Sequence, residues 1–427
     1  MKIKGTIYSI KIFHSILFLS IFFSSEAQNV SSPYSILGIG DVDTKDFGRY
    51  FSSGNASIAR RDATSYNFSN PASLTSLPFK TMHFDIAMRG KSSSFAFQGI
   101  DTATSITKDF IFKRATMAFK VSKKTGIAFG LRPYSSVNYK FQKDKVILDG
   151  NTSYTKYIEG YGGINQFYAS AGTELNKRLS AGITTSWLFG SLQRTTLYSG
   201  SSISLGILKH ETDFYTGAIF QGGLQYYSLP GRKWRHQLGL TTSVSTGLSG
   251  ELTTEYIEND ISIKSNTETG RNFKLPITVG IGYSAVSKDR LTLSVEGNFY
   301  NWSYQKVDYS NSFTYPAFRL SAGMDYSFKR VVNNVLYNNM SYEKSYISWG
   351  INIENSYLRI KNNPLWDYSF SLGGGLNITR NISVYTGLEV GIRGNKALDQ
   401  IKEEYTQYTF GFTVKDIWLG PRFKKYD

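Results

Sequence analysis

Apolar and polar residues alternate one by one in many segments of the chain. In residues 291–299 the odd positions carry Leu, Leu, Val, Gly and Phe, whereas the even positions carry Thr, Ser, Glu and Asn. A period of two residues is typical of a β-strand with one apolar face. The same alternation returns in residues 347–354, 382–393 and 408–415.

The alternation predicts about fourteen strands, each long enough to cross a bilayer at a tilt, for which roughly 9 to 11 residues suffice. An even number of strands allows an antiparallel barrel to close. The predicted strands lie near residues 80–90, 112–122, 125–136, 164–176, 178–191, 211–228, 234–250, 273–285, 289–303, 316–328, 344–358, 366–378, 381–394 and 404–415.

The connections between these strands alternate in length, as short periplasmic turns and long extracellular loops do in outer-membrane barrels. Short turns rich in turn-forming residues are expected at 122–126, 176–178, 230–232 and 379–381. Long polar loops are expected near 91–111, 137–163, 192–210 and 251–272. Residues 329–343 form a long connection where a short turn is expected, which puts the strand boundaries there in question.

A secreted β-sandwich or propeller also alternates, but three features favour a membrane barrel. The apolar face continues from strand to strand, the opposite face is filled with Gly, Ser, Thr and Asn, and no repeat of propeller length is visible. Tyrosine and tryptophan lie toward strand ends, as in interfacial girdles. We therefore predict an all-β, transmembrane antiparallel barrel over residues 79–416, followed by a C-terminal tail at 417–427.

The first 27 residues have the pattern of a secretory signal peptide. Lysines at the start precede an apolar run at 12–23, and Ser25-Glu26-Ala27 forms a small-residue cleavage end. The apolar run is about a dozen residues long, against the roughly 20 that a membrane-spanning helix needs. A signal peptide followed by a barrel predicts the outer membrane of a Gram-negative bacterium.

Composition excludes several classes of protein. The 427 residues contain no cysteine, so disulfides and thiolate metal sites are excluded, and an aromatic share of 15% excludes disorder for most of the chain. The 48 Lys+Arg outnumber the 32 Asp+Glu, yet they are spread over loops and turns and form no nucleic-acid-binding face. Outer-membrane lipid with anionic headgroups is the simpler partner for this charge.

No catalytic or cofactor motif in the sequence lies in the structural context that its chemistry requires. Residues 280–285 match a dinucleotide fingerprint formally, but they lie inside an alternating strand with no helix to follow. His83, His210 and His236 are far apart and lack metal-ligand spacing. We therefore predict no enzymatic activity, no cofactor and no metal site.

Residues 28–78 show small residues, short apolar pieces and turn signals without a long period. This segment contains Gly54 and ends with Asn70-Pro71-Ala72, directly before the first strand. Together with about fourteen strands, it resembles the FadL family of outer-membrane transporters for long-chain fatty acids and other hydrophobic molecules. The resemblance implies that residues 28–78 form a hatch inside the barrel, held by these four residues, and that the ligand is a hydrophobic small molecule.

The third predicted strand contains Gly130 and Pro133. Proline cannot donate a hydrogen bond to the next strand and glycine leaves a gap in the side-chain wall, so the strand is expected to kink there. In the FadL family a kink in the third strand makes a lateral exit for ligand, and this position resembles it. The alternative is that Pro133 only marks the outer end of the strand.

Several charged residues fall on the face opposite the apolar one, and hence toward the lumen. Inward charge braces a plug or lines a wet passage, and it fits an acyl-chain tunnel less well. A second hypothesis is therefore a non-transporting barrel subunit of an outer-membrane protein assembly or secretion complex, whose C-terminal tail contacts a partner or caps the barrel. The predicted lumen residues are His83, Asp85, Arg89, Arg114, Lys120, Arg132, Glu296, Glu354, Glu389 and Arg393.

Overall fold

A computed structural model of the chain describes most residues after the predicted signal peptide. The described residues are 32–96, 105–148, 152–200, 203–228, 233–259, 261–306, 313–334, 337–379 and 381–417. The predicted signal peptide at 1–27, the tail beyond Ile417 and the expected turn at 230–232 lie outside them. Within these ranges, no helix combines the length and the apolar character needed to cross a membrane.

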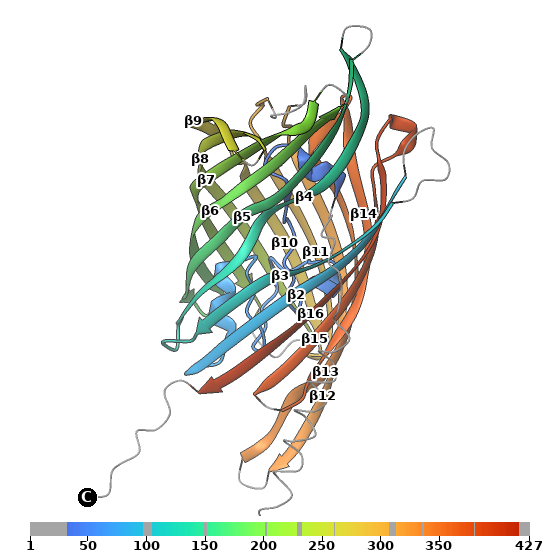
Figure 1. Ribbon diagram of the computed structural model, residues 1–427. Coiled ribbons are helices and arrows are strands. Elements are labelled where there is room, and N and C mark those ends of the chain that lie inside the picture. Colours follow the sequence, from blue (N-terminus) through green and yellow to red (C-terminus); the bar gives the residue numbers. More distant parts are fainter. Residues whose placement is uncertain are drawn as a thin grey trace, which may run out of the picture.

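Fourteen antiparallel strands close into a barrel, which confirms the predicted fold class (Figure 1). Each strand pairs with its neighbour in sequence except that β8 pairs with β10, and β16 closes the ring on β2. The strands are β2 (Thr81–Ala96), β3 (Ser105–Phe119), β4 (Thr125–Leu148), β5 (Thr152–Asn176), β6 (Leu179–Gly200), β7 (Ile203–Tyr227), β8 (Trp234–Glu258), β10 (Ile277–Ser287), β11 (Leu291–Asn301), β12 (Ala317–Asn334), β13 (Tyr337–Ile360), β14 (Asn363–Asn377), β15 (Ile382–Arg393) and β16 (Lys402–Ile417).

Two strands are additions to this ring. The short β1 (Asp41–Val42) pairs with β4, and β9 (Ile261–Phe273) pairs with the distal part of β8. Four short 3₁₀ helices complete the described elements: η2 (Pro33–Ile36), η3 (Phe51–Ser53), η4 (Pro71–Ser76) and η5 (Lys396–Leu398). The first three belong to the segment that precedes the barrel.

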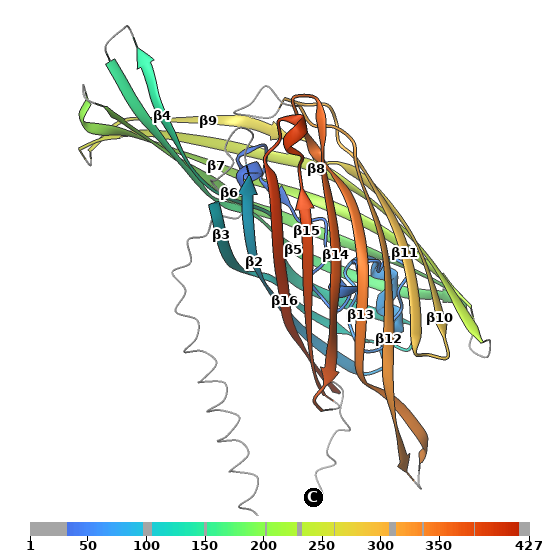
Figure 2. The same ribbon diagram turned by 90° about the vertical axis from the view of Figure 1, so that its right-hand side faces the viewer.

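The expected long extracellular loops are wrong over most of their length. Residues 137–163, for example, belong largely to β4 and β5, and β9 lies within the expected loop at 251–272. Both faces of β9 are exposed over most of its length, and between Ile263 and Phe273 its sequence carries no large apolar residue that could reveal a strand. Figure 2 shows β4 to β9 continuing on one side of the barrel well beyond the other strands.

The unusual connection at 329–343 is also mostly strand. Strands β12 and β13 continue past the neighbouring strands and pair with each other as far as Asn334 and Tyr337. In both views this hairpin extends beyond the other turns at the end of the barrel where the C-terminus lies (Figures 1 and 2). Short turns identify this end as the periplasmic one.

The outside of the barrel is apolar. Large hydrophobic side chains from most strands are exposed there, among them Ile183 at 65%, Ile281 at 62% and Trp349 at 43%. Such a belt around a closed barrel is the surface of a transmembrane barrel that faces lipid. The chain is therefore an outer-membrane protein, as predicted.

Residues 32–78 run inside the ring of strands, where Figure 1 shows them as a blue trace behind the wall. Most of their side chains are buried. The segment approaches the wall so closely that a side chain at Gly323 or Gly350 would overlap the backbone of Ser53 or Gly54. Gly54 itself has a φ of 65°, a left-handed conformation that favours glycine.

Candidate functional site: the lumen and the gap in the wall

The interior of the barrel is held together by ion pairs between the N-terminal segment and the wall. At the centre, Arg114 of β3 is 1% exposed and its guanidinium contacts Asp46 of the segment and Asp85 of β2. The Arg114 Nε donates to Asp85 Oδ1 at 2.9 Å. A side chain at Gly48 would overlap this guanidinium, so a larger residue there would have to displace Arg114 from its carboxylates.

Ion pairs of this kind join the segment to the half of the ring that runs from β3 through β16 to β12. Six charged residues of the segment pair with charged residues of β3, β12, β13 and β15. The pairs are Asp41 with Arg393 (2.9 Å), Asp43 with Lys113 (2.6 Å), Lys45 with Glu389 (2.8 Å), Asp46 with Arg114, Arg49 with Glu343 (2.6 Å) and Arg60 with Asp325.

Two predicted lumen carboxylates bind uncharged groups of the segment. Glu296 accepts hydrogen bonds from the backbone amides of Ser57 and Ile58 at 2.7 and 2.8 Å, and it pairs with Arg319 at 2.7 Å. Glu354 accepts from the Thr44 hydroxyl at 2.9 and 3.0 Å. The wall thus holds the segment by its backbone as well as by its charges.

The remaining predicted lumen residues are buried as well. Arg132 donates to the Lys45 carbonyl at 3.0 Å, and Arg89 pairs with Asp109 of the neighbouring strand at 2.7 Å. Lys120 donates to the Thr75 carbonyl at 2.7 Å, and His83 Nε2 lies 3.2 Å from the Thr81 hydroxyl.

The Asn-Pro-Ala motif joins the segment to the wall near the periplasmic end. The Asn70 side chain caps η4 by accepting from the Ala72 amide at 3.1 Å, and Pro71 occupies the first helical turn. The Asn70 amide donates to the carbonyls of Ile58 and of Leu224 on β7, at 3.0 and 3.1 Å. Ala72 is fully buried.

The sequence analysis did not predict the charged residues of the N-terminal segment that make these contacts. Lys45, Asp46, Arg49 and Arg60 are all buried, although each is charged. Such residues are almost never fully buried unless they are paired. The charged residues within this segment of small residues and short apolar pieces were therefore the available signal that it pairs with the wall.

Asp62 illustrates the electrostatics of the segment. Burial alone would raise the pKa of this carboxyl, whereas the Arg49 guanidinium, whose Nε lies 2.9 Å away, favours its charged form. Hydrogen bonds from the Thr64 hydroxyl and amide act in the same direction. The pKa of Asp62 is therefore lowered, and the carboxyl is ionised at neutral pH.

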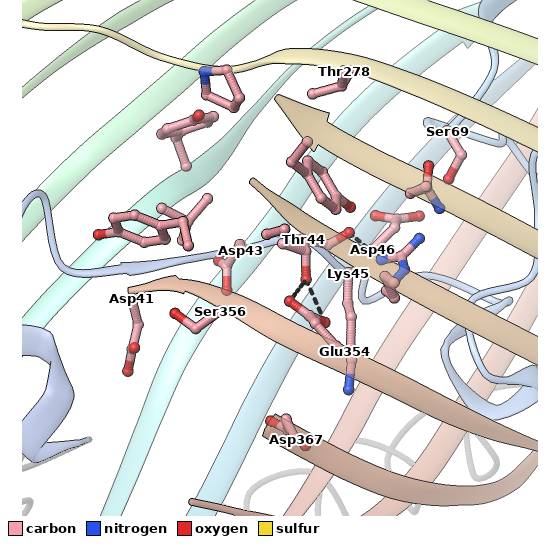
Figure 3. Close-up of a pocket in the computed structure, with 18 of the residues that line it drawn as sticks. Asp41, Asp43, Thr44, Lys45, Asp46, Ser69, Thr278, Glu354, Ser356 and Asp367 are labelled. Atoms are coloured by element: carbon pink, nitrogen blue, oxygen red, sulfur yellow. Dashed lines mark hydrogen bonds between the residues drawn. The ribbon is translucent and has the colours of Figure 1, made fainter. Parts of the chain in front are cut away.

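A cavity of about 280 Å³ with a mixed polar and apolar lining remains between the segment and the extracellular half of the wall. Figure 3 shows Thr44 bonded to Glu354, with Lys45 extending past them toward Asp367. Tyrosine and tryptophan rings line part of the cavity. Its charged lining residues are balanced between acids and bases: Asp41, Asp43, Lys45, Asp46, Arg89, Lys91, Arg132, Glu296, Arg319, Glu354, Asp367 and Arg393.

The wall is interrupted between β3 and β4. Their pairing ends at Ala115 and Leu131, and beyond this point β4 pairs with β1 instead, with Val42 opposite Ser135. A register shift follows Pro133 on the other side of β4. The segment therefore occupies the gap in the wall.

The two residues of the predicted kink have different surroundings. A side chain at Gly130 would overlap the Ala115 carbonyl and the Tyr168 ring, so glycine is needed there to seat Tyr168 against the wall. Pro133 lies just before the register shift, where a missing donor costs least. Lys113 is the extra residue of a bulge between β2 and β3, and it reaches across the gap to Asp43.

Comparison with solved structures identifies the same architecture. The chain matches a Pseudomonas aeruginosa FadL homologue with a TM-score of 0.59 at 11% identity, over 90% of this chain and 100% of that one. It matches the CymD monoaromatic hydrocarbon channel at 0.57 and 13%, over 90% and 99%. It matches the Ralstonia pickettii toluene transporter TbuX at 0.55 and 15%, over 87% and 99%.

These likenesses confirm the FadL-type resemblance at the level of the fold: this chain has the architecture of outer-membrane channels for hydrophobic compounds. No curated protein matches the sequence. A protein-family model does match, however, and it is distinct from FadL. Because this model, BamG, covers residues 9–427, the chain belongs to the BamG family.

Proposed function

We propose that this barrel is a non-transporting subunit of an outer-membrane protein assembly, and that the N-terminal segment is a fixed plug. The observation that carries the proposal is the set of six ion pairs between the segment and four strands of the wall. Removing one partner of a buried pair costs about 3 to 5 kcal/mol, because the other charge stays buried. A central passage would require several pairs to separate together.

The chemistry of the cavity also argues against an apolar cargo. A site for a hydrophobic ligand is lined mainly by apolar and aromatic groups. Here the lining mixes twelve charged residues with a similar number of apolar and aromatic ones. An apolar molecule in this space would strip water from charged groups without replacing its hydrogen bonds, which is unfavourable.

A partner surface is available above the membrane. Strands β4 to β9 form a sheet that extends beyond the rest of the barrel (Figure 2), and β9 pairs with β8 alone among the described strands. Ile261 and Ile263 are 65% and 56% exposed on the same face of β9. An exposed edge strand with apolar side chains is a template for pairing with another chain.

Copurification in mild detergent tests this proposal. The wild-type protein should be recovered with other envelope proteins in constant proportion, and the variant Ile261→Lys with Ile263→Lys should lose them. Leu398→Lys, at an exposed apolar residue of η5 away from that edge, is the matched control and should keep them. Recovery of the wild type as a lone monomer under several solubilisation conditions would refute the proposal.

A second candidate is passive uptake of hydrophobic small molecules, with lateral exit between β3 and β4. The interrupted pairing after Ala115 and Leu131 favours it, because beyond this point β4 is covered by the N-terminal segment, through β1 and η2, and no longer by β3. In this case the N-terminal segment is a hatch that has to leave the gap. Asp43 and Lys113 would then act as its latch.

An engineered disulfide separates the two candidates. Val42 and Ser135 are directly paired, at a separation compatible with a disulfide, and the chain has no other cysteine. In the variant Val42→Cys with Ser135→Cys, oxidation should block uptake of a hydrophobic probe if the segment gates the gap. The pair Thr253→Cys with Thr267→Cys, between β8 and β9, is the control. Uptake that is equal in the oxidised and reduced forms would exclude lateral exit.

A further inference from the structure

Exposed charge is distributed unequally between the two ends of the barrel. Among the described residues, the extracellular end exposes six basic and six acidic side chains. The periplasmic end exposes nine basic side chains but only two acidic ones, Asp289 and Asp416. Asp289 is moreover engaged by Arg235 and Lys329. The periplasmic end therefore carries a large excess of positive charge.

Six of these nine residues lie in three short turns, which together we call the basic rim. They are Lys123 and Lys124 between β3 and β4, Lys177 and Arg178 between β5 and β6, and Lys288 and Arg290 between β10 and β11. In the closed ring, the β3–β4 turn and the β10–β11 turn lie on opposite sides of the barrel. The rim thus extends around the wall and is no single patch.

The rim lies where the apolar belt ends. Leu175 is 56% exposed just before Lys177, and Phe79 is 43% exposed next to Lys80. The Lys80 ammonium is 5.6 Å from the centre of the Phe79 ring. Long basic side chains at this level keep their stems along apolar surface and extend their charges to the lipid headgroups.

We propose that the basic rim binds the anionic phospholipid headgroups of the inner leaflet of the outer membrane. A leaflet surrounds the barrel and meets turns on opposite sides at once, which the contact patch of one acidic protein does not. Basic residues near an anionic membrane surface attract it, and salt weakens this attraction. A preference of the rim for anionic lipid would hold for a sealed barrel and for a transporting one alike.

The test compares lipid retention by the wild type and two variants. Each protein is the whole chain without the predicted signal peptide. The rim variant carries Gln at the six rim positions, none of which forms a side-chain ion pair with another described residue. The control variant removes equal charge at the extracellular end by replacing Lys108, Lys140, Lys264, Lys274, Lys306 and Lys361 with Gln. Each protein is placed in nanodiscs with equal amounts of phosphatidylethanolamine and phosphatidylglycerol, and native mass spectrometry counts the lipids retained.

The wild type and the control variant should retain phosphatidylglycerol in preference to phosphatidylethanolamine. The rim variant should lose this preference by about fivefold or more, and high salt should reduce it in the wild type. Heat-modifiable migration on gels verifies that each variant is folded. Equal preference in the rim and control variants would overturn the proposal. So would an unchanged lipid preference together with loss of a copurifying acidic protein from the rim variant, which would identify a protein partner.

Discussion

Replacing Lys45 with methionine should loosen the N-terminal segment by a measurable amount. The Lys45 ammonium lies 2.8 Å from Glu389, whose side chain has no exposed surface. Without the ammonium, the carboxylate keeps hydrogen bonds from Gln407 at 2.7 Å and from the Tyr405 hydroxyl at 3.2 Å. We therefore expect the low end of the cost of breaking a buried pair, about 3 kcal/mol.

That cost should lower the free energy needed to open the N-terminal segment away from the wall. When the segment leaves the wall, water reaches Glu389, so the variant loses stability in the closed form only. A change of about 3 kcal/mol raises the open population roughly 150-fold. Hydrogen exchange of amides in residues 44–58 should accelerate by about the same factor if opening equilibrates before exchange.

Two controls make this prediction specific. Adding Glu389→Gln to Lys45→Met removes the unpaired charge and should restore most of the protection. Lys140→Met removes a pair between side chains that are 67% and 56% exposed, and it should leave exchange of the segment unchanged. Exchange in the Lys45→Met variant that matches the wild type would refute the reasoning that buried pairs fix the segment.

Three further changes test other parts of the structure. Asn70→Ala removes the η4 cap and two donated hydrogen bonds and should destabilise the folded protein by about 2 kcal/mol in denaturant titration, whereas Asn70→Asp should retain the cap. Asp62→Asn should be less stable than the wild type at neutral pH. Because the folded pKa of Asp62 is lowered, its contribution is present above the unfolded pKa of about 4 and is lost as the pH falls through the folded pKa, so the two proteins should converge in acid. Pro133→Val should leave folding on gels intact, whereas Gly130→Val should impair it, because only Gly130 lacks room for a side chain.

Most of the fold was predictable because the membrane imposes a simple rule. Lipid faces one side of each strand and the lumen the other, so the spanning parts alternate strictly. The rule fails outside the bilayer. Strand β9 is wetted on both faces, and its sequence, ISIKSNTETGRNF, therefore resembles a polar loop. The distal part of β5 was also missed, since the prediction began at residue 164 and the strand begins at Thr152.

Of the residues that meet in the lumen, only those of the barrel wall were predictable. Alternation identifies inward-facing residues of the wall, such as Asp85 and Glu389, because each has apolar neighbours in the strand. It gives no information about the segment 32–78, which has no period. The partners Lys45 and Asp46 are fixed by tertiary packing across more than sixty residues of sequence, so local pattern could not reveal them.

The central claim is that this barrel is a sealed member of an assembly, and native mass spectrometry of protein extracted gently from its own membrane tests it most directly. We predict a complex of constant stoichiometry with other envelope proteins, which releases no hydrophobic ligand from the lumen when it is denatured. A monomer that releases a defined hydrophobic molecule would contradict the claim and establish transport instead.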